Sequence, residues 1–175
     1  GIKFNIPFKL VNRDVFTSEP AVFQTNDRVV ASIDFVCRED IMQIISKTTW
    51  DMVIFDEAHK LSAYEYGEKL YKSKRYEVAH ILSQQCEHLL LLTATPYRGR
   101  KDTFKRLLQL LDDDIFATAD LATERVRELG MNGANKFFIR RLKEDMKDWD
   151  GNPLYKERHT KTTSYNLTFD EKLLY

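Results

Sequence analysis

The chain has 175 residues, of which 43% are hydrophobic and 31% charged, and its 27 basic residues balance its 27 acidic ones. This composition excludes a disordered or fibrous protein, the length suits one domain with a hydrophobic core, and the zero net charge excludes a global positive field. No apolar run approaches the ~20 residues of a membrane span, so we expect a soluble cytoplasmic protein with no membrane partner. Its two cysteines lack the spacing of a disulfide framework or a zinc site.

Short apolar strands alternate with amphipathic helices along the chain, which is typical of α/β proteins. Residues 28–36 are rich in β-branched side chains and are predicted to form a strand, and residues 38–47 carry isoleucines at helical spacing. Residues 52–55, Met-Val-Ile-Phe, form a continuous apolar run, as expected of a parallel strand covered on both faces. A helix over 74–86 and a strand over 88–92 follow.

The second half of the chain contains one clear helix and a weaker pattern after it. Residues 101–111 carry one apolar stripe at helical spacing, which predicts an amphipathic helix. A break at 130–135 precedes a basic segment at 136–147, and residues 160–167 alternate like a strand. The chain opens without a methionine and stops within an expected element, so we expect both ends to continue in a longer protein.

Two carboxylates directly follow the apolar run, in the tetrapeptide Asp-Glu-Ala-His at 56–59. In α/β sheets, ligands bind outside the carboxyl ends of parallel strands. A phosphoryl-transfer site there needs one carboxylate to hold magnesium and another group to orient the attacking water. Asp56 suits the first role and Glu57 the second. The alternative is a strand that ends in two solvated acids.

A second polar group follows the strand expected at 88–92, in the sequence Thr-Ala-Thr-Pro at 93–96. The hydroxyls of Thr93 and Thr95 can hydrogen-bond to the acids of the neighbouring strand or to a phosphate-bound water, which would couple nucleotide state to loop position. The alternative is that both threonines satisfy backbone groups before a proline turn. The two motifs in this order are more specific than either alone.

Together the two motifs resemble the Walker B and third motifs of superfamily 2 helicases and translocases, and residues 50–61 are similar to the Swi/Snf and RapA-like type. Residues 30–34, Val-Ala-Ser-Ile-Asp, resemble the serine motif with which these enzymes touch the nucleic-acid backbone. Residues 137–145 resemble the Arg-Arg-x-Lys-x-Asp block that joins the first lobe to the second. The resemblance covers residues 29–175.

The resemblance implies a partial RecA-like P-loop NTPase lobe, in which a mainly parallel sheet is flanked by helices. Residues 1–115 would be the C-terminal part of the first lobe, and residues 116–175 the inter-lobe region with the start of the second. It also implies an ATP-dependent helicase or translocase that uses ATP and Mg²⁺ and acts on nucleic acid, with DNA preferred over RNA. The expected protein partners are the second lobe of the same parent chain and a complex such as a polymerase or a defence assembly.

The resemblance also implies roles for individual residues. Asp56 would bind magnesium through water, Glu57 would act as the catalytic base, and His59, Thr93 and Thr95 would couple hydrolysis to lobe movement. Ser32 would contact a phosphate; a buried serine with satisfied hydrogen bonds is the alternative. The basic residues of the last block would bind nucleic acid or the lobe interface, with salt bridges to neighbouring acids as the alternative: Arg140, Arg141 and Lys143.

The phosphate-binding sequence Gly-x-x-x-x-Gly-Lys-Ser/Thr does not occur in these residues. We therefore expect it upstream in the parent, which would be the ATP hydrolase, while this chain alone would be inactive. Two other functions remain open: a binding module that has lost hydrolysis, and the motor subunit of an ATP-dependent restriction system. Four tyrosines could stack on bases, but their irregular spacing favours packing: Tyr64, Tyr66, Tyr71 and Tyr76.

Overall fold

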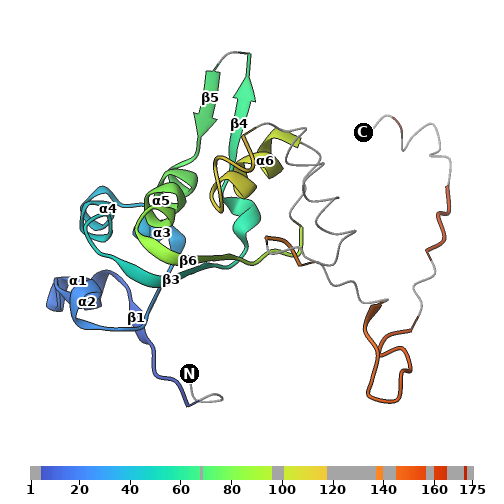
Figure 1. Cartoon of the computed structure of the whole chain (residues 1–175), viewed down its shortest axis with the longest axis horizontal. Helices are drawn as coiled ribbons and strands as arrows, with labels where there is room; N and C mark the ends of the chain where they lie inside the picture. Colours follow the sequence, from blue (N-terminus) through green and yellow to red (C-terminus); the bar gives the residue numbers. More distant parts are fainter. Residues whose placement is uncertain are drawn as a thin grey trace. The chain divides into compact units, whose positions relative to one another are not determined.

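The computed structural model describes residues 5–67, 69–95, 101–117, 137–139, 145–156, 160–164 and Lys172. The chain divides into two compact units, Gly1–Phe137 and Phe138–Tyr175. Within the described residues, all named helices and strands belong to the first unit (Figure 1). The acidic motif at 56–59 and Thr93 and Thr95 lie in the first unit.

The first unit combines helices with short strands. The elements in chain order are β1 (Lys9–Val11), α1 (Arg13–Ser18), α2 (Val22–Thr25), β2 (Val29–Ala31), α3 (Ile33–Val36), α4 (Glu39–Ile45), β3 (Trp50–Phe55), the 3-10 helix η2 (Ala58–Lys60), β4 (Ala63–Tyr66), β5 (Lys69–Lys72), α5 (Lys74–Ser83), β6 (Cys86–Leu91) and α6 (Lys101–Gln109). The strands and helices predicted around 52–55, 88–92, 38–47, 74–86 and 101–111 are confirmed, with ends that differ by a few residues.

The described strands form three pairs. β1 pairs with β2 and β3 with β6, both parallel, whereas β4 and β5 form an antiparallel hairpin. The predicted α/β class and the parallel pairing are confirmed. Within the described residues, however, the four parallel strands form two separate pairs rather than one sheet, and the hairpin was not predicted from the sequence.

The prediction of a strand over residues 28–36 is wrong for the second half of this segment. β2 ends at Ala31, and Ser32 begins the helix α3. The Ser32 hydroxyl accepts a hydrogen bond from the Phe35 N–H at 3.2 Å, and Asp34 lies in the first turn. A serine cap with an acid in the first turn stabilises a helix start, and this local signal outweighs the β-branched composition.

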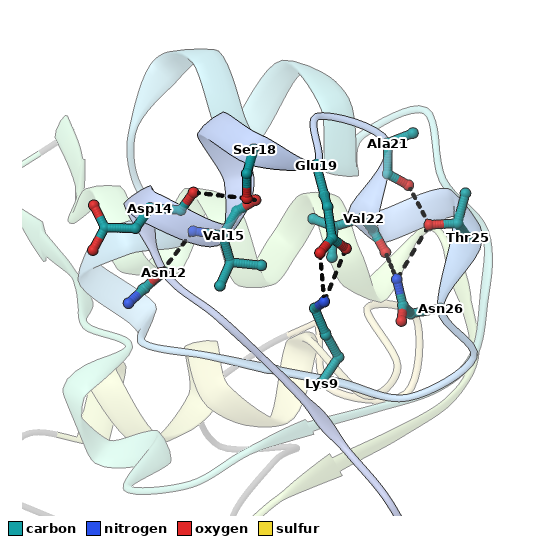
Figure 2. A network of polar contacts seen from close by, with 10 residues as sticks. All are labelled: Lys9, Asn12, Asp14, Val15, Ser18, Glu19, Ala21, Val22, Thr25 and Asn26. Atoms are coloured by element: carbon teal, nitrogen blue, oxygen red, sulfur yellow. Dashed lines mark hydrogen bonds and ion pairs between the residues drawn. The ribbon is translucent and has the colours of Figure 1, made fainter.

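The two short helices α1 and α2 are held by local side-chain contacts, shown in Figure 2. Asn12 caps α1 because its Oδ1 accepts the Val15 N–H at 3.0 Å. At the other end of α1, Lys9 forms an ion pair of 2.7 Å with Glu19. The Asn12 cap satisfies one of the backbone N–H groups that a helix start leaves unpaired, and the ion pair ties the end of α1 to β1.

The hydrophobic core covers one face of the β3–β6 pair. Val53 and Phe55 of β3 pack into it together with buried side chains from α2, α4 and α5. On the opposite face Met52, Ile54 and Leu90 are 53%, 55% and 43% exposed. The expectation that the 52–55 strand is covered on both faces is therefore wrong for the described residues, because their helices pack against one face only.

Helix α5 links the core to α6. It begins at Ser73, whose hydroxyl accepts the Tyr76 N–H at 3.2 Å, and it buries Val78 and Ala79 completely. The Tyr76 hydroxyl donates to the backbone oxygen of Arg106 in α6 at 3.1 Å, and burial raises the pKa of this tyrosine. The sequence expectation that Tyr76 packs rather than stacks on a base agrees with its burial.

The described part of the second unit contains a tight turn around Asp148. Its carboxylate accepts the backbone N–H groups of Asn152 at 2.8 Å and Asp150 at 2.9 Å, and these hydrogen bonds lower the pKa of Asp148. A bridge between Lys147 and Pro153 closes the turn. Across the described residues of both units, no helix combines the length and apolarity that crossing a membrane requires.

Candidate active site

The loops after β3 and β6 lie side by side because the two strands are parallel and in register. Phe55 is paired with Leu91 at the last position of both strands. The pairing continues beyond them: the Leu92 N–H donates to the Phe55 oxygen, and the Ala58 N–H donates to the Leu92 oxygen, each at 2.8 Å. The acidic motif and the threonine motif are therefore brought to one edge.

The backbone turns sharply at the acidic pair. Glu57 has φ 52° and ψ 44°, a left-handed conformation that is uncommon for a residue with a side chain and costs about 1–3 kcal/mol. Its N–H donates to Asp56 Oδ1 at 2.9 Å, and its carbonyl accepts the Lys60 N–H at 2.9 Å. These bonds and the η2 turn hold the strained conformation and leave both carboxylates at the surface.

His59 joins the two loops. Its side chain is only 10% exposed, and its Nδ1 lies 3.1 Å from Glu57 Oε2 and 3.0 Å from Thr93 Oγ1. Both oxygens are therefore within contact distance of the same ring nitrogen. Glu57, His59 and Thr93 thus form one continuous chain of contacts.

The threonine loop contributes the Thr93 hydroxyl, which has two polar neighbours. Thr93 Oγ1 accepts a hydrogen bond from the Thr95 N–H at 3.1 Å and is also hydrogen-bonded to His59 Nδ1 at 3.0 Å. The side chain of Thr95 is exposed beside it.

The donor set fits magnesium bound together with a phosphate ligand. One Asp56 oxygen caps Glu57, and its exposed carboxylate has a second oxygen to offer. Within the described residues no three His, Cys, Asp or Glu side chains converge as a metal cage. Magnesium commonly uses one or two carboxylates and takes its remaining ligands from water and phosphates, so Asp56 is suited to hold such an ion.

Of the remaining predicted site residues, Ser32 is the one that lies in the described part of the chain. Ser32 is exposed and caps α3, so the alternative of a buried serine does not hold. Its neighbour Asp34 is paired with Arg75 at 2.7 Å. The basic residues Arg140, Arg141 and Lys143 lie outside the described residues, so their predicted contacts stay predictions.

Sequence reasoning missed two features of this region. The left-handed turn at Glu57 has no sequence signal, because glycine or asparagine is the usual residue there. The β4–β5 hairpin does have one: residues 63–66 and 69–72 flank Gly67, which adopts φ 61° in the turn. Two short aromatic runs around a glycine are a hairpin signal that could have predicted it.

A comparison with protein families assigns the chain to a class. The model of the SNF2-related domain matches residues 8–149, which is most of the chain, so the chain belongs to this family. The resemblance to Swi/Snf and RapA-like proteins is thereby confirmed.

Among curated proteins, the chain is similar to several that are named RNA polymerase-associated protein RapA. Identity is 36% over 121 residues for the protein from Vibrio cholerae serotype O1 and 33% over 120 residues for that from Yersinia enterocolitica. For Erwinia tasmaniensis it is 34% over 120 residues. Each match covers 65% of this chain but only 12% of the relative, so the chain spans a small part of the length of these proteins.

Proposed function

We propose that this chain is part of the first RecA-like lobe of an ATP-driven translocase that moves along or remodels nucleic acid, with duplex DNA as the substrate. Membership of the SNF2-related family supports the general class. The observation that carries the proposal is the chain of contacts from Glu57 through His59 to Thr93. It connects a candidate catalytic base to the loop of the neighbouring strand.

The acidic pair performs two tasks in this proposal. Asp56 holds the magnesium of Mg-ATP through water, and Glu57 orients the attacking water and accepts its proton. Magnesium, when bound, neutralises charge on the β- and γ-phosphates. Glu57 Oε2 faces His59, which leaves the other carboxylate oxygen for water at a half-exposed position. Both acids follow the carboxyl end of β3, where α/β sheets bind nucleotides.

His59 and Thr93 couple the nucleotide to loop position. A change in the hydrogen bonds of Glu57 on phosphate release alters the contact that Glu57 makes with Nδ1 of His59. The same Nδ1 holds Thr93, and Thr93 in turn holds the Thr95 N–H. Loss of one charged ligand contact is therefore transmitted to the loop that leads toward α6.

The rest of the proposal concerns the longer protein. The basic block at 140–143 joins the two lobes or contacts nucleic acid, and residues 116–175 include the inter-lobe region. The phosphate-binding loop and the second lobe come from flanking sequence. Because the similar proteins are named for association with RNA polymerase, a polymerase is the protein partner to test first.

The decisive experiment is Glu57→Gln in the complete protein, including the sequence that flanks these residues. Glutamine has the same shape and can keep the contact with His59, but it cannot accept a proton from water. Loss of a general base lowers turnover by about a hundredfold or more. We expect ATP hydrolysis to fall by this amount while equilibrium binding of ATP is retained.

Glu87→Gln is the matched control. Glu87 is an exposed acid near the start of β6, at the opposite end of the strand from the site. We expect this variant to hydrolyse ATP at the wild-type rate. An unchanged rate in Glu57→Gln would remove Glu57 from catalysis, and an equal loss in both variants would show that the effect is not specific to the site.

A further inference from the structure

The β4–β5 hairpin has two faces of different character. Its register pairs Tyr64 with Tyr71 and Tyr66 with Lys69, so these four side chains share one face. Ala63, Glu65, Leu70 and Lys72 share the other. Figure 1 shows both strands extending away from the β3–β6 pair. The tyrosines that are irregularly spaced in the sequence thus become neighbours through strand pairing.

Helix α6 anchors the second face. Glu65 forms ion pairs with Arg106 and, at 3.8 Å, with Lys105, and its backbone N–H donates to Asp102 at 3.1 Å. Ala63 is fully buried at the base of the hairpin. These contacts explain how a two-stranded hairpin, which is marginal in isolation, is held in place.

The first face, which we call the tyrosine face, comprises Tyr64, Tyr66, Lys69 and Tyr71. Tyr66 is 75% exposed and Tyr71 is 45% exposed. The rings of Tyr64 and Tyr71 stack with centroids 5.4 Å apart and planes inclined by 15°. Rigid, exposed aromatic rings lose little conformational entropy when a planar group stacks on them.

The chemistry of the tyrosine face selects a planar and anionic partner. Lys69, directly opposite Tyr66, is exposed and presents a cationic group beside the ring. The sequence places Glu68 next to it, outside the described residues, so stacking rather than charge has to supply most of the affinity. An unpaired nucleic-acid strand combines exposed base faces with a phosphate at each nucleotide, and aromatic platforms bind such strands.

The elements that hold the hairpin are connected along the chain to the loops of the candidate site. Only Leu61 and Ser62 separate β4 from η2, the turn that contains His59. The Ser73 N–H donates to the Ser62 oxygen at 3.0 Å and closes the base of the hairpin. Helix α6, which holds the anchored face, follows the loop of Thr93 and Thr95 along the chain. A strand bound to the hairpin would therefore contact an element attached to both loops.

We propose that the tyrosine face of the β4–β5 hairpin is a binding site for an unpaired nucleic-acid strand, with bases stacked on Tyr66 and Tyr71 and a phosphate at Lys69. Its role as a second contact of a translocase rests on the proposed function. The binding itself does not require hydrolysis and is testable without ATP.

The test measures binding of a fluorescein-labelled oligo(dT) strand to the complete protein by fluorescence anisotropy in the absence of ATP. Loss of one stacking platform weakens binding by about five- to a hundredfold, so we expect this change for Tyr66→Ala. Tyr66→Phe keeps the ring and should bind like the wild type. Because Tyr66 is largely exposed, neither change removes core packing.

Two lysines of β5 provide a matched pair. Lys69→Ala removes a charge from the tyrosine face and Lys72→Ala removes one from the other face. We expect Lys69→Ala to weaken oligo(dT) binding by a few-fold and to reduce its salt dependence, and Lys72→Ala to do neither. Equal effects of the two changes would overturn the proposal, because they would show only general electrostatic attraction.

Wild-type affinity in Tyr66→Ala would also overturn the proposal, because it would show that the strand does not stack on the tyrosine face. Failure of the proposed translocase function would be seen in a separate measurement, the rate of ATP hydrolysis. If DNA does not stimulate ATP hydrolysis by the unmodified protein, the proposed translocase function is wrong. The oligo(dT) measurements would still decide whether the hairpin binds an unpaired strand.

Discussion

At the residue scale, the position of His59 illustrates how neighbouring motifs become one site. A histidine two residues after a glutamate would ordinarily point elsewhere, but the left-handed turn at Glu57 and the η2 turn bring Nδ1 back to the carboxylate. The same nitrogen reaches Thr93 on the adjacent loop. One side chain of low exposure therefore contacts both loops.

Ser32 offers a test of a single residue with two proposed tasks, helix capping and phosphate contact. Aspartate caps helices as well as serine does, but its charge repels a phosphate. We therefore expect Ser32→Asp to leave stability unchanged and to weaken duplex DNA binding by the complete protein. Urea unfolding and a DNA titration at fixed salt check the two halves.

Ser32→Ala is the complementary variant, because it removes the cap without adding charge. We expect it to lower the free energy of unfolding by about 1 kcal/mol. Normal DNA affinity in Ser32→Asp would leave Ser32 with the capping role alone.

At the scale of elements, the contact between α5 and α6 determines where the hairpin is held. Tyr76 of α5 donates its hydroxyl hydrogen to the backbone of Arg106, and the Arg106 side chain binds Glu65 of β4. Three elements therefore meet around one residue of α6. Displacing α6 would release the anchored face of the hairpin together with this contact.

Tyr76→Phe removes this hydrogen bond while keeping the buried ring. A buried hydrogen bond contributes about 1 kcal/mol, and the Arg106 oxygen would lose its Tyr76 partner, so we expect a loss of that size in the free energy of unfolding. Urea unfolding of this chain measures it. Tyr71→Phe is the control because Tyr71 is partly exposed and water can replace its contacts; equal losses in both variants would contradict the role of Tyr76.

At the scale of the whole molecule, one core connects most elements of the first unit. Buried side chains from β1, α2, α4, β3, α5 and α6 belong to a single cluster, and a second, smaller one contains Leu108 and Phe116. The larger cluster fixes which face of β3 and β6 is covered.

Ile41→Ala tests the larger cluster, since Ile41 in α4 is completely buried. Removing a large aliphatic side chain from a core leaves a cavity and costs about 2–5 kcal/mol. We expect a loss in this range by urea unfolding of this chain. Gln43→Ala, at an exposed position of the same helix, should have little effect. A loss below that range for Ile41→Ala would mean that the cluster repacks readily around α4.

The sequence alone determined those strands and helices whose apolar residues form a local, regular pattern. The apolar runs at 52–55 and 88–92 predicted β3 and β6, and the parallel pairing of these strands follows from helices and strands in alternation. The apolar stripe at 101–111 likewise predicted α6. The acidic and threonine motifs, through their resemblance to motifs of Swi/Snf-type proteins, indicated the family to which the chain belongs.

Tertiary structure decided how distant residues meet. The Glu57–His59–Thr93 contacts depend on the register of two strands and on a strained turn, and neither is encoded in a short pattern. The tyrosine face likewise arises from cross-strand pairing, which turned irregular spacing into one surface. Local propensity acts between neighbours in the chain, whereas these arrangements result from packing between residues far apart in it, so only the folded molecule defines them.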